Sequence, residues 1–374
     1  MKQFASYEEE NIHYWTNRAS GYSGVNQEEL ATSQKTVWRG VISRRIAARF
    51  PGKKPSQIRV LDVGTGPGFF AIILAELGYQ VTAVDYTASM LEEAKGNAGA
   101  LAEKIDFRQM NAEKLTFSTA SFDVLVTRNV TWNLPNPEKA YAQWMRVLKP
   151  GGLLLNFDAN WYRYLWDEDA QAAHAQDREN LQASDVRDET AGTDVDAMEA
   201  IARKTPLSRL HRPAWDLDVL RGLGMQAAAD TEVWKQVWTK EERINNASTP
   251  MFLVEGHKAG VPTFVSKLPA TLLLTALSIG MTVVISVPLG VLAAVRHDRL
   301  TDYFLRFFSF VGNSLPNFFV TLLLMQVFSI RLISTGRKFY PARRHLPIKW
   351  LIPFYPALFA QAAEGDEKCM DYVF

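Results

Sequence analysis

The sequence predicts a doubly wound α/β domain followed by transmembrane helices. Residues 59–85 contain two strand-like apolar runs joined by a glycine-rich loop and an apolar helical run, the pattern of a parallel β-α-β unit. Residues 268–295 form a run of 28 positions without a charged side chain, which is long enough to cross a bilayer as a helix. We therefore expect two regions that meet near residue 260 of the 374.

The charges of the chain are divided unevenly between these regions. Residues 261–374 carry 11 Lys and Arg against 6 Asp and Glu, whereas residues 1–260 carry 30 against 34. Because nucleic-acid binding needs clustered basic residues, we expect no nucleic-acid partner for the acidic region. The single cysteine, Cys369, excludes an internal disulfide, and the six histidines lack a ligand spacing, so we predict no metal.

Two helices are expected ahead of the sheet. They cover residues 8–26 and 34–50, and the segment 51–56 breaks the chain before the first strand. The first residues are too charged for a secretory signal, so we expect the domain to face the cytoplasm. Tyr14 and Tyr22 either lie over a cationic ligand or only attach the first helix to the core, and the sequence favours neither alternative.

The glycine-rich loop connects the first strand to a helix. Gly64, Gly66 and Gly68 are spaced G-x-G-x-G, so that a ligand can lie directly against the main chain. Phe69 stands where the dinucleotide fingerprint has its third glycine, which disfavours a nicotinamide oxidoreductase. The next strand ends at Asp85, 21 residues after Gly64, where open α/β sheets place the acid that binds a ribose diol. Loop and acid together predict a nucleoside site.

Residues 1–258 resemble class I S-adenosylmethionine-dependent methyltransferases of the small-molecule, type 11 kind. The resemblance rests on the motif D-x-G-x-G-x-G at 62–68, on Asp85, on the segment "QMNAEKL" and on the K-P-G-G turn at 149–152. It implies a Rossmann-like sheet, S-adenosylmethionine as cofactor and a small-molecule methyl acceptor. The cofactor-binding residues that it implies are Asp62, Gly64, Thr65, Gly66, Gly68, Asp85, Tyr86, Met90, Asn111, Ala112 and Arg128, with Tyr14 and Tyr22 from the first helix.

The segment of about residues 160–212 interrupts the α/β order after the fifth strand. It is acidic and helix-prone, and we expect it to form a lid over the acceptor or else a solvated surface excursion. Because the sulfonium donor is already activated, positioning supplies much of the rate and no catalytic residue is assigned. The candidate acceptor residues, each with ordinary loop packing as the alternative, are Asn129, Trp132, Asp158 and Tyr162.

Two uncharged runs after residue 260, 268–295 and 307–330, predict membrane spans. Residues about 262–332 resemble part of the permease subunit of nickel and peptide ABC importers, without the loop that docks the ATPase, so we expect a gene fusion rather than a transporter. The basic tail, 333–374, favours a cytoplasmic position, and its apolar run after Lys349 is short for a third span. An incomplete transporter component and a donor-binding protein without turnover remain the alternatives to a methyltransferase.

Overall fold

The computed structural model describes residues 4–260, 263–296 and 299–314. The chain divides into two units, Met1–Leu268 and Pro269–Phe374, so the first unit ends close to the expected domain end at Gly260. Most of the expected second span, 307–330, and the whole tail, 333–374, lie outside the described residues.

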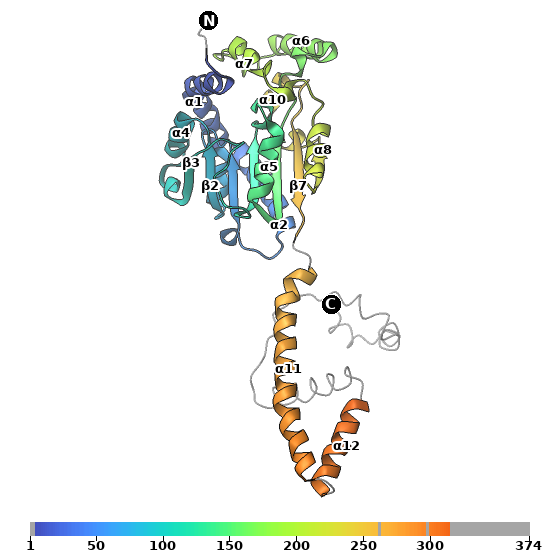
Figure 1. The fold of residues 1–374 in the computed structure, drawn as a ribbon. Coiled ribbons are helices and arrows are strands. Elements are labelled where there is room, and N and C mark those ends of the chain that lie inside the picture. Colours follow the sequence, from blue (N-terminus) through green and yellow to red (C-terminus); the bar gives the residue numbers. More distant parts are fainter. Residues whose placement is uncertain (1–3, 261–262, 297–298, 315–374) are drawn as a thin grey trace, which may run out of the picture. The chain divides into compact units, whose positions relative to one another are not determined.

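The first unit is built on a sheet with the strand order β3-β2-β1-β4-β5-β7-β6 (Figure 1). Strands β1 to β5 are parallel, and β7 runs antiparallel to both β5 and β6. The chain winds outward from β1 in one direction and from β4 in the other, so the predicted doubly wound sheet is confirmed, and the switch point lies between these strands. The strands are β1 Arg59–Val63, β2 Gln80–Asp85, β3 Ile105–Gln109, β4 Phe122–Arg128, β5 Leu148–Asp158, β6 Met225–Asp230 and β7 Phe252–Lys258.

Helices bury both faces of this sheet. Val60 belongs to a core cluster with α2 and α3, and its neighbour Leu61 belongs to a second cluster with α5 and α8. Burial on both faces explains why the parallel strands are continuous apolar runs in the sequence. The helices outside the insertion are α1 Tyr7–Ala31, α2 Ser33–Arg49, α3 Phe69–Glu76, α4 Ala88–Ala98, α5 Pro137–Val147, α8 Ala214–Gly222, α9 Trp234–Val237 and α10 Lys240–Asn245.

The first helix is longer than the short helix that the sequence predicts. It begins after Ser6, whose side chain accepts a hydrogen bond from the backbone N–H of Glu9, and it continues for 25 residues. Polar residues along its middle, which weaken the apolar pattern, are buried by tertiary contacts: Ser23, Asn26 and Glu29 are each less than 9% exposed. The length of α1 therefore depends on packing against the rest of the domain rather than on its own periodicity.

The insertion after β5 forms four short elements. They are η4 Arg163–Leu165, α6 Glu168–Gln182, α7 Val195–Ala202 and η5 Pro206–Ser208. Met198 and Ile201 of α7 pack with Tyr14 of α1 and with Trp132, which follows β4. The insertion therefore covers α1 and the loop after β4, at the end of the domain where Figure 1 shows α1, α6 and α7 together.

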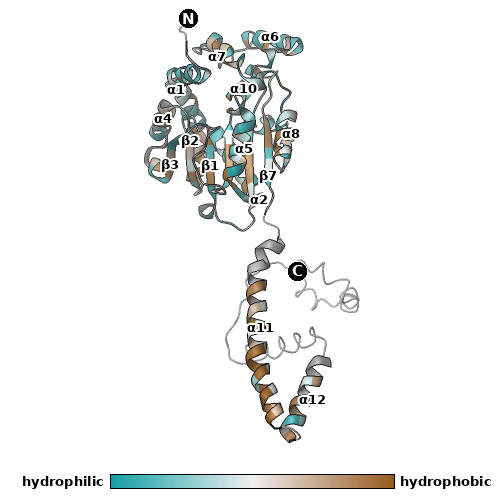
Figure 2. Cartoon of the chain, in the orientation of Figure 1, coloured by the Kyte–Doolittle hydropathy of each residue, from teal (hydrophilic) through white to brown (hydrophobic). Residues whose placement is uncertain are grey.

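Helix α11 follows the domain and spans Thr263–Val295, so it contains the whole of the predicted span 268–295. Apolar residues cover most of its surface in Figure 2. The segment Thr275–Val295 has a mean hydropathy of 2.1 and none of it is buried. Within the parts of the chain that the structure describes, it is the one helix that is long and apolar enough to cross a membrane.

Helix α12, Leu300–Ser314, begins before the second predicted span, 307–330, and includes its first residues. The guanidinium of Arg306 donates to both carboxylate oxygens of Asp302, at 3.0 and 2.7 Å, one helical turn away. This i, i+4 ion pair stabilises the first turns of the helix.

Candidate functional site

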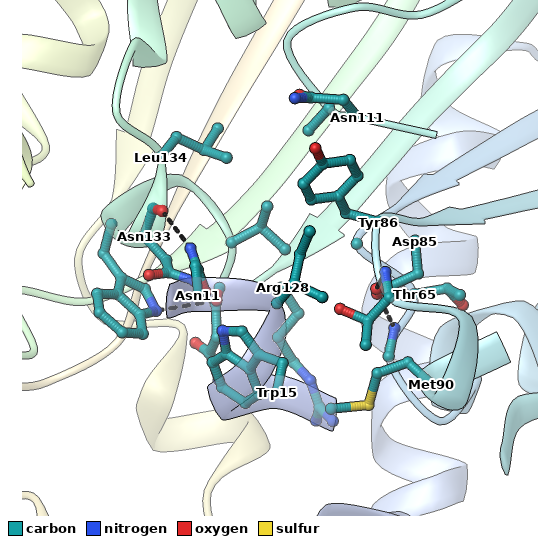
Figure 3. Close-up of a pocket in the computed structure, with 18 of the residues that line it drawn as sticks. Asn11, Trp15, Thr65, Asp85, Tyr86, Met90, Asn111, Arg128, Asn133 and Leu134 are labelled. Atoms are coloured by element: carbon teal, nitrogen blue, oxygen red, sulfur yellow. Dashed lines mark hydrogen bonds between the residues drawn. The ribbon is translucent and has the colours of Figure 1, made fainter. Parts of the chain in front are cut away.

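A cavity of about 300 Å³ lies at the carboxyl ends of the central parallel strands. The residues of its wall come from α1, from the glycine loop after β1, from the end of β2, from segment 110–113 and from the loop after β4 (Figure 3). This is the edge of an open α/β sheet at which ligands bind, beside the switch point of the strand order. Asp85 and Met90 lie at one end of the cavity, and Asn11 and Asn133 lie at the other.

The three glycines of the loop serve different purposes. All have a positive φ: +66° at Gly64, +53° at Gly66 and +95° at Gly68. A Cβ at Gly64 would lie 2.3 Å from Val130 Cγ2, and one at Gly68 would lie 3.0 Å from Ala94 Cβ, so both positions also need glycine for packing. Gly68 precedes α3 and lies outside the cavity wall, so its predicted contact with the cofactor stays a prediction.

Asp85 joins the end of β2 to the glycine loop. Its Oδ2 accepts the backbone N–H of Gly66 at 2.9 Å, and its Oδ1 accepts that of Thr87 at 2.9 Å. Burial raises the pKa of this carboxyl group. Asp85 lies in the cavity wall at the end of β2, where open α/β sheets place the acid that binds a ribose diol. Two adjacent hydroxyls of a ribose fit this arrangement.

Asp62 is the second buried acid of the cavity. It is 1% exposed, and its Oδ2 accepts the hydroxyl of Thr65 at 2.7 Å. Burial raises the pKa of Asp62 from 3.8 to about 7. A cationic ligand group beside Asp62 would favour its charged form again, so this acid suits the ammonium group of an amino-acid moiety.

Arg128, at the end of β4, lines the cavity but is already paired. Its Nη1 donates to Glu29 Oε1 at 2.7 Å and its Nη2 donates to Glu29 Oε2 at 2.9 Å. The guanidinium also lies over the ring of Phe69, at 4.8 Å from the centroid. Arg128 therefore ties α1 to the sheet and is not a free anion-binding group. Sequence reasoning missed Glu29, because nothing in the local pattern connects it with Arg128.

The two tyrosines of α1 differ in position. Tyr22 lines the cavity, with its ring 3.5 Å from where a Cβ on Gly66 would lie. Tyr14 is outside the cavity wall and packs in the cluster of α7 and Trp132. This packing favours attachment to the core as the role of Tyr14, and a contact of Tyr14 with the ligand stays a prediction. The other predicted residues that line the cavity are Thr65, Tyr86, Met90, Asn111 and Ala112.

Of the predicted acceptor residues, Asn129, Trp132 and Tyr162 line the cavity and Asp158 does not. Asp158 is fully buried, and its Oδ2 accepts the backbone N–H of Trp132 at 3.1 Å and pairs with Arg212 Nη1 at 2.8 Å. Arg212 comes from the far end of the insertion, so the sequence around Asp158 gives no sign of its partner. Asp158 is corrected from an acceptor contact to a structural ion pair.

A hydrogen-bonded group at the far end of the cavity was missed by sequence reasoning. Tyr7 donates its hydroxyl to the carbonyl oxygen of Asn133 at 2.7 Å, and Asn11 Nδ2 donates to that hydroxyl at 3.0 Å. Asn133 Nδ2 completes the group by donating to Asn11 Oδ1 at 3.1 Å. Burial raises the pKa of Tyr7, so its hydroxyl remains protonated. These contacts fasten the start of α1 to η3, Thr131–Asn133.

The insertion contributes only its first residues to the cavity wall, namely Trp161 and Tyr162. Its later part, α7, packs against α1 and Trp132 instead. Its effect on the cavity is therefore mainly to hold α1 in place, and the prediction that it forms a lid over the acceptor stays a prediction.

Comparisons with known proteins agree with this geometry. Residues 61–156 match the family described as "Methyltransferase domain". Demethylmenaquinone methyltransferase of Renibacterium salmoninarum is 34% identical over 131 residues, which cover 35% of this chain and 51% of that protein. The ubiquinone/menaquinone biosynthesis C-methyltransferase of Brucella anthropi is 35% identical over 142 residues, covering 37% of this chain and 52% of that protein.

A solved structure of a SAM dependent methyltransferase from Aquifex aeolicus aligns with 57% of this chain and 88% of its own, at 18% identity and a TM-score of 0.37. The chain spans about half the length of the curated relatives it matches. The matched residues include the glycine loop, Asp85 and the end of β4. Residues 61–156 are therefore a class I methyltransferase domain. The cofactor of this domain is S-adenosylmethionine, and Asp62 and Asp85 fit its ammonium and ribose groups.

Proposed function

We propose that the protein transfers a methyl group from S-adenosylmethionine to a small molecule. The observation that carries this proposal is the position of Asp85, which lies in the cavity wall at the end of β2 and holds the glycine loop through the N–H of Gly66. A nucleoside bound there lies against a main chain that Gly66 leaves without a side chain. A dinucleotide would need glycine where Phe69 stands.

The residues of the cavity bind and enclose the donor. Asp85 accepts the ribose hydroxyls, Asp62 faces the ammonium group, and Tyr86 and Met90 line the same end of the cavity. Bound S-adenosylmethionine supplies an activated methyl group. Trp15 and Tyr22 of α1 line the cavity, while the Tyr7–Asn133 contact holds the start of this helix in place.

Catalysis in this proposal is chiefly positioning. The residues of the cavity wall, all of them in the described part of the chain, include no histidine, lysine or cysteine. Holding two reactants in an attack geometry contributes up to about 7–11 kcal/mol in favourable intramolecular systems. A nucleophile that needs no strong base suits such a wall.

Product analysis tests the proposal directly. Full-length protein in detergent is incubated with S-adenosylmethionine and a panel of small amines, phenols, thiols and quinols, and S-adenosylhomocysteine is measured by mass spectrometry. The quinols are included because the named relatives act in menaquinone and ubiquinone biosynthesis. We expect acceptor-dependent formation of S-adenosylhomocysteine that Asp85→Ala abolishes. Tight donor binding without product for any acceptor class would favour a donor-binding protein instead.

We also propose that α11 anchors the protein in the cell membrane, with the methyltransferase domain facing the cytoplasm. The support is the length of α11 and the exposure of its apolar side chains, such as Leu273 at 62% and Val284 at 71%. The resemblance of residues about 262–332 to importer permeases remains a prediction from the sequence. Full-length protein should sediment with membranes after a carbonate wash, and recovery in the soluble fraction would contradict the anchor.

A further inference from the structure

The charged residues of the cavity wall are mostly acids. The wall contains the carboxyl groups of Glu8, Asp62, Asp85 and Glu113, and its one basic residue is Arg128. Both terminal nitrogens of Arg128 are bound by Glu29, which is 6% exposed. The described wall therefore offers no unpaired cation to a carboxylate or a phosphate of an acceptor.

Glu113 places a buried negative charge near the end of the cavity that lies away from Asp85. It is 4% exposed, and its two oxygens accept from the backbone N–H of Asn136 at 2.8 Å and from Asn136 Nδ2 at 3.1 Å. Both donors are neutral, so they orient this carboxylate without cancelling its charge. The charge of Glu113 also acts on Tyr7. Burial is the main cause that raises the pKa of the Tyr7 hydroxyl, and the nearby carboxylates of Glu10 and Glu113 raise this pKa further.

Aromatic side chains form much of the remaining wall. Trp132 and Tyr162 contact each other with ring centroids 4.8 Å apart, and Trp15 packs 6.0 Å from the ring of Tyr22. All four line the cavity, together with Trp161. Aromatic faces attract cations and flat apolar groups. The aromatic rings and the acidic side chains of the wall therefore both favour a cationic ligand with a flat apolar body.

Asn129 is a polar residue of the wall with a left-handed backbone. Its φ is +57°, in the region that glycine and asparagine adopt most readily. Its N–H donates to the carbonyl of Phe157 at 2.8 Å, and its own carbonyl accepts from Trp132 Nε1 at 2.9 Å. Its side-chain oxygen is enclosed and has no hydrogen-bond partner. The same amide interacts with the hydroxyl of Tyr22. Because an unpaired enclosed acceptor costs free energy, a donor group of the ligand that reaches this oxygen would stabilise it.

We propose that the acceptor is a primary or secondary amine on a flat apolar body, and that Asn129 positions it by accepting one of its N–H groups. This inference rests on the proposed methyl transfer and names the acceptor class for that site. The carboxylates and aromatic faces bind the amine as its ammonium ion. The aromatic wall holds the apolar body of the same molecule.

The charges of the reaction favour an amine over an anionic acceptor. The ammonium ion first releases a proton to water. The nitrogen lone pair then forms the bond to the methyl carbon, and the sulfur–methyl bond breaks with its electrons left on sulfur. The positive charge thus passes from sulfur to nitrogen, and one more proton leaves the product amine when it returns to its neutral form. Because an amine keeps the positive charge inside the acidic cavity, while an anion would cancel it, the wall stabilises transfer to nitrogen.

Calorimetry on the full-length protein in detergent, saturated with S-adenosylhomocysteine, tests this class. The probes are phenethylamine and 3-phenylpropanoate, which share the ring and differ in charge. We expect phenethylamine to bind at least about tenfold more tightly than 3-phenylpropanoate. Equal affinities, the reverse order, or binding of neither probe while S-adenosylhomocysteine binds would overturn the amine assignment. Failure of S-adenosylhomocysteine itself to bind would overturn the proposed function instead.

The role of Asn129 is tested by Asn129→Gly, because glycine adopts the positive φ without strain and the variant should fold. We expect about tenfold weaker binding of phenethylamine and unchanged binding of S-adenosylhomocysteine. Ala120→Gly is the matched control, since Ala120 has a φ of +58° and lies outside the cavity wall. Wild-type affinity for phenethylamine in Asn129→Gly, or the same loss in Ala120→Gly, would overturn the assignment of Asn129.

Discussion

The two ends of the cavity are built from different parts of the sequence. The end at Asp85 is formed by one β-α-β unit, residues 59–90, in which the contacts between functional residues span about twenty positions, as from Gly66 to Asp85. The end at Asn133 is assembled by α1, the loop after β4 and the start of the insertion, and its bond from Tyr7 to Asn133 spans 126 positions. The first end can be recognised from a local motif, and the second needs the fold.

Glu29 ties α1 to the end of β4 through Arg128, so its removal should have the largest effect. Glu29→Ala leaves the guanidinium of Arg128 buried without its carboxylate, and we expect a loss of about 3–5 kcal/mol in the free energy of unfolding. Urea denaturation of the full-length protein in detergent measures it. The double variant Glu29→Ala, Arg128→Met should recover part of the loss, because it removes the uncompensated charge. A loss of less than about 1 kcal/mol in the free energy of unfolding would mean that water stabilises the charge of Arg128 once Glu29 is removed.

Asp85→Ala should weaken donor binding by about 2–4 kcal/mol, since it removes charge-assisted hydrogen bonds to the diol and the support of Gly66. Titration with S-adenosylhomocysteine measures the change. The control is Asp106→Ala, because Asp106 pairs with Arg108 on the surface of β3. If both variants bind the donor alike, the ribose is not at the end of β2.

Asp62→Asn should stabilise the ligand-free protein at pH 8 by about 2 kcal/mol. The folded state raises the pKa of Asp62 from 3.8 to about 7, so ionising this group costs stability that is lost progressively as pH rises from about 4 to about 7. The asparagine variant avoids that cost, and its advantage should shrink towards pH 4. Thermal unfolding across this range measures the advantage, and a pH-independent difference would contradict it.

Asp62→Asn should also bind the donor more weakly, because the ammonium group of the donor loses the carboxylate that faces it. In the wild type, donor binding should release a proton near pH 6, as the ligand cation lowers the pKa of Asp62. Calorimetry in buffers of different ionisation enthalpy detects this release. Glu242, whose pKa burial also raises to about 7, lies outside the cavity wall. Burial also raises the pKa of Asp85, which lines the cavity, so the release should decrease in Asp62→Asn.

Tyr7→Phe should have the smallest effect, about 1 kcal/mol in the free energy of unfolding, because it removes the hydrogen bonds to Asn133 and leaves the ring. Donor affinity should stay within about twofold, since the contact lies at the other end of the cavity. A larger loss of donor affinity than of stability would mean that the start of α1 controls the donor directly.

The predicted residues of the β-α-β unit, Gly64, Gly66, Asp85 and Met90, line the cavity. The strands around them follow from apolar runs, and the contact from Asp85 to Gly66 is local along the chain. Asp158 and Tyr14 lie outside the cavity wall, because their partners, Arg212 and α7, come from the insertion. Glu29 was missed for the same reason, since only the packing of α1 on β4 brings it to Arg128.

The central claim is that the cavity beside Asp85 binds S-adenosylmethionine rather than a dinucleotide. Calorimetric titration of the full-length protein in detergent with S-adenosylmethionine and, in parallel, with NAD tests it most directly. The geometry of the glycine loop, with Phe69 at the position of the third dinucleotide glycine, predicts tight binding of S-adenosylmethionine that Asp85→Ala removes, and little heat from NAD. Tighter binding of NAD than of S-adenosylmethionine would contradict the account.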